Sequence, residues 1–142
     1  MVNIDAAAVH AGIDPRLRQL AGLAAAEPVV DVLWLYGSRA TGCSSPDSDY
    51  DLAVAFNVFP PEPVDRRLQP ELLALRWLDV LGLPEGALSV VDINAAPLSL
   101  AHAVVTDGQV LYCRDGLRLA REENRVTSMW ELDHLHHRRV YG

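Results

Sequence analysis

The chain has 142 residues, a net charge of −7 and no lysine, because all 12 of its basic residues are arginines. This length is typical of one compact domain, so we expect a single domain over residues 1–142, with a C-terminal helical arm from about residue 115. The missing lysine excludes a P-loop lysine and a Schiff-base lysine, and the acidic balance argues against direct binding of nucleic acid.

The expected cellular location follows from the apolar segments and the cysteines. No apolar run reaches about eighteen residues, and the N-terminus carries acid where a signal peptide carries base. Cys43 and Cys113 are too few for a disulfide framework and lack a metal-type pair spacing. We therefore expect a cytoplasmic protein with free thiols and no membrane contact.

The first part of the chain predicts one helix and two strands. The helix starts at Pro15, is capped by Asp14, and ends near Pro28. β-branched and aromatic residues over 29–36 predict a buried strand that stops at a Gly-Ser pair. DYDLAVAF, residues 49–56, predicts the second strand.

The rest of the chain predicts alternating helices and strands. The proline-rich segment 57–65 is expected to be a surface loop, with helical spacing from about Pro70 to Leu81. Four more elements are expected: a strand over 87–94, a short helix over 97–108, a short strand over 109–113 and a long polar helix over 117–139. This order predicts an α/β (α+β) fold, with helices packed on one side of a small mixed sheet.

Two aspartates close the stretch GSRATGCSSPDSDYD, residues 37–51. Asp49 and Asp51 are two positions apart in an expected strand, so both side chains point to one face, at one edge of the sheet. Like charges so close are costly unless a divalent cation neutralises them. If Asp92 joined them from the next strand, three carboxylates could hold two Mg²⁺ ions about 3.5–4 Å apart for in-line phosphoryl displacement.

The Gly-Ser pair at the start of the same stretch predicts a phosphate site. Gly37 has no Cβ, so its backbone can approach a phosphate closely, and Ser38 begins a helical turn with free N–H groups and a hydroxyl. Arg39 is the only basic residue between Arg18 and Arg66 and can balance the charge of a triphosphate. One short stretch can therefore supply both a phosphate-binding turn and a pair of metal ligands.

These residues resemble a known motif. Gly-Ser, ten residues and then Asp-x-Asp is similar to the defining motif of the DNA polymerase β-like nucleotidyltransferase superfamily. GSRATG followed by SDYDL resembles its minimal prokaryotic branch, the MNT-type antitoxins that occur with HEPN-family toxins. VVDINAAPLSLAHAVVTDGQVLYCRD is similar to the later strand and helix of that family, with Asp92 as its third carboxylate. The resemblance covers about residues 29–120.

The resemblance implies a polymerase β-like fold and a Mg²⁺-dependent enzyme that binds ATP and transfers AMP to a hydroxyl group. The acceptor implied is a tyrosine of a cognate HEPN ribonuclease toxin, which is blocked within a hetero-oligomer. Gly37 and Ser38 would contact the nucleotide, and Asp49 and Asp51 would bind metal. Asp92 would be a metal ligand or a base.

Two other functions stay open from the sequence. One is adenylylation of a small molecule, as in the related aminoglycoside nucleotidyltransferases, although these usually carry an added acceptor-binding domain, which we do not expect in these 142 residues. The other is a non-catalytic antitoxin that only covers its toxin. The retained Gly-Ser and Asp-x-Asp residues argue against simple covering, which would not need them.

Several other features have ordinary interpretations. DSDYD begins like a calcium loop, but Leu52 and Val58 stand where that loop needs glycine and glutamate. The histidines of HLHH, residues 134–137, are more typical of an exposed helix face than of a metal site. An apolar Met129-Trp130 pair on a charged helix fits either the core or a partner interface.

Overall fold

The computed structural model describes residues 14–42 and 49–141. Its elements are α2 (Pro15–Ala26), β1 (Val30–Tyr36), α3 (Ser38–Thr41), β2 (Tyr50–Phe56), α4 (Pro63–Leu81), β3 (Leu88–Asp92), α5 (Leu98–Asp107), β4 (Gln109–Cys113) and α6 (Gly116–Tyr141). Asp14 caps α2 as predicted, because its carboxylate accepts a hydrogen bond from the backbone N–H of Arg16 at 2.9 Å. No helix in these residues is both long and apolar enough to cross a membrane.

The four strands form one mixed sheet in the order β3-β2-β1-β4. β1 pairs antiparallel with β2 and β4, whereas β2 and β3 are parallel. The small mixed sheet predicted from the sequence is therefore confirmed. β2 is therefore an inner strand of the sheet. Residues at its N-terminal end lie between the last residues of β1 and the first residues of β3.

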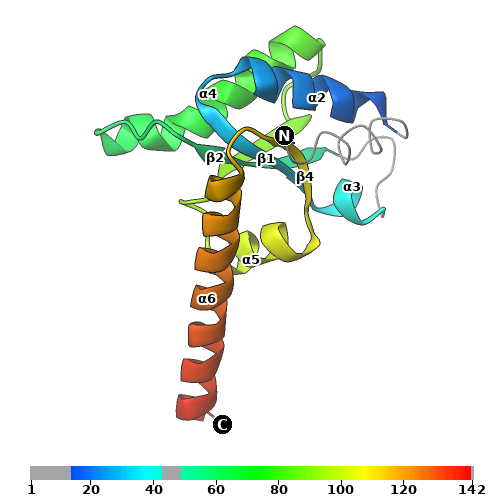
Figure 1. The fold of residues 1–142 in the computed structure, drawn as a ribbon. Helices are drawn as coiled ribbons and strands as arrows, with labels where there is room; N and C mark the ends of the chain where they lie inside the picture. Colours follow the sequence, from blue (N-terminus) through cyan, green and yellow to red (C-terminus); the bar gives the residue numbers. More distant parts are fainter. Residues whose placement is uncertain (1–13, 43–48, 142) are drawn as a thin grey trace.

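Helices cover both faces of this sheet: α2 and α4 pack on one face, and α5 and α6 pack on the other (Figure 1). The expectation that helices pack on one side only is wrong. Both faces of β1 are apolar, since Leu33 and Leu35 point toward α2 and α4 while Val32 and Trp34 point toward α5 and α6. Strands that are apolar on both faces need cover on both.

The helix α4 begins earlier than the sequence predicted. Residues 63–69 are helical and not part of a surface loop, with Pro63 in the first turn, where its missing N–H is tolerated. Pro70 then lies inside the helix and removes one backbone hydrogen bond. The helix continues through it because Leu73 and Trp77 are buried against the sheet. Burial of this apolar face outweighs the local cost of a proline.

A buried ion-pair network fixes α6 to the sheet. Side-chain nitrogens of Arg118 lie 3.0 Å from a Glu122 oxygen and 3.5 Å from an Asp31 oxygen, and Arg118 also donates to the carbonyl of Phe56 at 2.8 Å. Burial alone would raise the pKa of Glu122, but hydrogen bonds from Arg125, an asparagine and Arg118 lower it. The carboxylate therefore stays ionised. The second half of α6 projects beyond the rest of the chain (Figure 1).

Candidate active site

The Gly-Ser turn lies directly beside the start of β2. In the antiparallel pair of β1 and β2, Tyr36 is the partner of Asp51, so the residue that follows Tyr36 meets the Asp51 side chain. Gly37 has φ +74°, and a Cβ at this position would lie 2.5 Å from Asp51 Oδ2. Only glycine combines this backbone conformation with this close approach. The two halves of the motif therefore contact each other.

The two aspartates of the Asp-x-Asp pair lie close together. Asp49 immediately precedes β2, and Asp51 is its second residue. Burial raises the pKa of Asp51, and the nearby charge of Asp49 raises it further. Mg²⁺ is commonly bound by one or two carboxylates together with substrate phosphates, so this pair fits a divalent cation. In the part of the chain that the structure describes, no third acidic, histidine or cysteine side chain joins the pair to form a metal cluster.

Asp92 does not converge on this pair, contrary to the expectation from the sequence. In the parallel pairing of β2 and β3, Asp51 is opposite Ser89, whereas Asp92 is opposite Val54. Val54 is three positions beyond Asp51, which is about 10 Å along the strand. An odd number of positions also places the two side chains on opposite faces. Asp92 is therefore not placed to share a cation with Asp49 and Asp51.

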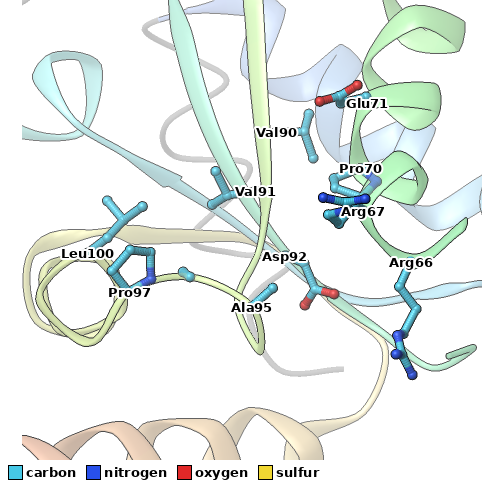
Figure 2. A pocket seen from close by; sticks show the side chains of 11 residues that line it. Arg66, Arg67, Pro70, Glu71, Val90, Val91, Asp92, Ala95, Pro97 and Leu100 are labelled. Atoms are coloured by element: carbon cyan, nitrogen blue, oxygen red, sulfur yellow. The ribbon is translucent and has the colours of Figure 1, made fainter. Parts of the chain in front are cut away.

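Asp92 instead ends β3 beside a separate pocket of about 250 Å³. Figure 2 shows Asp92 in the pocket wall next to Ala95, with Arg66 across from it. Its Oδ1 accepts a hydrogen bond from the backbone N–H of Asn94 at 2.9 Å. Burial raises the pKa of Asp92, although this hydrogen bond and the nearby Arg118 act against the shift. In this setting Asp92 stabilises the turn after β3.

The residues after Gly37 form one short helix. Ser38 is the first residue of α3, as the predicted helical turn requires. The guanidinium of Arg39 lies over the Tyr50 ring, 4.0 Å from its centroid, and 3.9 Å from a carboxylate oxygen of Asp14. Tyr50 belongs to the sheet face that α2 covers, so Arg39 lies on the opposite face from Asp51. Through these contacts Arg39 holds α3 against the start of α2.

Two residues near the carboxylates were not predicted from the sequence. Tyr36 and Ser89 flank Asp51 on the neighbouring strands, and all three form one row across the sheet. Burial raises the pKa of the Tyr36 hydroxyl, and the charge of Asp51 adds to the shift. The position of Tyr36 just before Gly37 was the available signal in the sequence. The sequence held no such signal for Ser89, because its position opposite Asp51 depends on the register between β2 and β3.

Other residues considered in the sequence lie away from this site or outside the described residues. Cys43 lies outside them, and Cys113 is a buried free cysteine. Trp130 packs within the chain, because its ring stacks on His102 with centroids 4.0 Å apart. Met129 is exposed on α6. The region 134–137 is also exposed, as an ordinary helix face would be.

Comparison with known proteins assigns the family. Residues 18–117 match the family described as Polymerase beta, Nucleotidyltransferase. The chain belongs to this family. It is also 30% identical over 104 residues to the protein adenylyltransferase MntA of Aphanizomenon flos-aquae (strain 2012/KM1/D3), an alignment that covers 70% of this chain and 67% of that protein. The resemblance inferred from the sequence motif is confirmed.

Solved structures share the fold of this chain. A toxin–antitoxin crystal structure with AMP-PNP contains a chain with a TM-score of 0.68 and 20% identity, covering 87% of this chain and 94% of that one. A complex of a tri-AMPylated Shewanella oneidensis HEPN toxin with an MNT antitoxin gives a TM-score of 0.62 at 18% identity, covering 87% of this chain and 91% of the other. At these identities the comparison shows the fold, which is that of a polymerase β-like nucleotidyltransferase.

Proposed function

We propose that this chain is an antitoxin that transfers AMP from ATP to a hydroxyl group of a HEPN-family toxin, with tyrosine as the acceptor. The contact between Gly37 and Asp51 carries this proposal, because it joins a turn suited to phosphate to a pair of carboxylates suited to a cation. The MntA relative is a protein adenylyltransferase, and a structurally similar antitoxin is bound to an AMPylated HEPN toxin. Both similarities support the same reaction.

Some of the site residues would bind the nucleotide, and the others would bind the cation. Gly37 and Ser38 would bind phosphate oxygens through the backbone and the serine hydroxyl, while Arg39 adds positive charge at this end of the sheet. Asp49 and Asp51 would hold Mg²⁺, which neutralises phosphate charge and favours displacement at phosphorus when it is bound. The acceptor oxygen would bond to the α-phosphorus of ATP, pyrophosphate would leave, and the hydroxyl proton would pass to solvent.

Two alternatives differ from this proposal in what they predict. A small-molecule adenylyltransferase would consume ATP without modifying a protein. A binding-only antitoxin would neutralise the toxin without ATP and without Asp49 and Asp51. Because ATP is the proposed substrate, we expect the reaction to occur in the cytoplasm, within a hetero-oligomer of antitoxin and toxin.

The proposal is tested by co-expressing the chain with its cognate HEPN-family toxin and measuring the intact mass of the purified toxin. The toxin should gain whole AMP units with the unaltered chain and none with the Asp49→Asn, Asp51→Asn variant. A matched control is the Asp79→Asn, Asp107→Asn variant, which removes the same charge from exposed helix positions. If the toxin is neutralised by all three chains and gains no mass, the transfer proposal is wrong.

A further inference from the structure

The residue opposite Asp51 on β3 is a serine. Parallel pairing aligns Asp51 with Ser89 and, two positions on, Ala53 with Val91. Ala53 and Val91 both contribute to the core beneath α5 and α6, so alternation places Asp51 and Ser89 on that same face. Neighbouring strands are about 4.8 Å apart, which brings the two side chains side by side. Ser89 is also exposed, so solvent or a ligand can reach it.

The position of Ser89 is where a third carboxylate would have to stand. A residue on β3 can meet a cation held by Asp51 only if it shares the sheet face of Asp51 and lies level with it. Ser89 meets both conditions, and Asp92 meets neither. A serine hydroxyl is a neutral oxygen that can accept or donate a hydrogen bond but does not add negative charge. The site therefore carries two carboxylates and one hydroxyl.

We propose that Ser89 lines the transfer site opposite Asp51, and that this chain binds its divalent cation through Asp49 and Asp51 only, with nucleotide phosphates completing the coordination. This inference rests on the proposed function and specifies how its metal site is built. With two protein charges instead of three, the cation binds weakly to the free chain and tightly only with nucleotide. Cation and nucleotide binding are thereby coupled.

The electrostatics around Asp92 support the same assignment. Its Oδ1 is already hydrogen-bonded to the Asn94 backbone, and Arg118 and Arg125 also lower the pKa of Asp92, although the charge of Glu122 raises it. A carboxylate with cationic neighbours and a backbone partner has less need of a metal ion. Asp51 has the opposite environment, since its nearest charge effect comes from Asp49. The cation thus belongs with the pair at the start of β2.

The test uses Mn²⁺ as the probe and measures its binding to the purified full chain by electron paramagnetic resonance, with and without AMP-PNP. The informative variants are Ser89→Asp, which would add the third carboxylate, and Asp92→Asn. Ser128→Asp is the matched control, because it adds the same charge at an exposed position of α6. Ser89→Asn supplies a neutral oxygen ligand if the extra charge of Ser89→Asp impairs folding.

Without nucleotide, Ser89→Asp should tighten Mn²⁺ binding by about tenfold or more, while Ser128→Asp and Asp92→Asn leave it unchanged. Ser89→Asn should tighten it by a smaller factor. The inference is overturned if Asp92→Asn weakens Mn²⁺ binding, or if every Ser89 variant binds like its control. Failure of the proposed function looks different: Mn²⁺–AMP-PNP would then bind equally well when Asp49 and Asp51 are both replaced by asparagine.

Discussion

The backbone of Gly37 rests against the carboxylate of Asp51, so that a Cβ on Gly37 would lie 2.5 Å from Asp51 Oδ2. The contact exists because β1 and β2 are antiparallel neighbours and Tyr36 is the partner of Asp51. It sets the distance between the turn proposed to bind phosphate and the carboxylate proposed to bind metal. Adding a single carbon atom, the Cβ of an alanine at position 37, therefore tests this arrangement.

Gly37→Ala should remove nucleotide-dependent Mn²⁺ binding and cost about 1–3 kcal/mol of folding stability, because the new Cβ clashes with Asp51 in a backbone conformation that alanine rarely adopts. Gly42→Ala is the matched control. Gly42 has φ +79°, but no atom of the described residues lies within 4 Å of its added Cβ. Calorimetric melting and Mn²⁺ binding should separate the two variants, and equal losses in both would argue against the contact.

Asp51→Asn should stabilise the metal-free chain at about pH 7.5 and have little effect near pH 4. Burial, and then the charge of Asp49, raise the pKa of Asp51 in the folded state. An ionised carboxylate with a raised pKa destabilises the fold, and this destabilisation disappears as the pH falls and the group binds a proton. Melting temperatures in EDTA across this pH range check the sign. A lower melting temperature for the variant at pH 7.5 would contradict it.

Arg118→Met should lower the free energy of unfolding by about 3–5 kcal/mol, because it removes a cationic partner from two buried carboxylates, one of which keeps Arg125 as a second partner. These are Glu122 and Asp31, which are 5% and 8% exposed. Arg121→Met is the control, since Arg121 lies on the same helix but is exposed; we expect a change within about 0.5 kcal/mol. Urea unfolding measures both variants, and similar values would show that the network adds little.

Local patterns in the sequence predicted most elements. Asp14 and Pro15 marked the start of α2, and the apolar run of β1 marked a buried strand. The early start of α4 was missed, because the prolines of residues 57–65 suggested a loop although Pro63 is compatible with a first helical turn. The second helical layer was also missed. Apolar side chains on both faces of β1 were the signal for it.

The candidate site was predictable only as far as local sequence reaches. Gly37 and Asp51 belong to one spaced motif, so their meeting could be anticipated. Asp92 was assigned to the site because it ends the next strand in sequence, but its neighbour depends on the register of a parallel pair. Parallel strands are joined by a long crossover and not by a tight turn, so a short sequence motif does not predict their register. For this reason the sequence pointed to Asp92 as the neighbour of Asp51, whereas the structure places Ser89 there.

The transfer of AMP to the toxin is tested most directly by mixing the purified chain and its HEPN-type toxin with ATP labelled on either the α- or the γ-phosphate. The account predicts that α-label becomes covalently attached to the toxin, that γ-label is released as pyrophosphate, and that the Asp49→Asn, Asp51→Asn variant transfers neither. Covalent γ-label on the toxin, or no label from either nucleotide while the toxin is still neutralised, would contradict it.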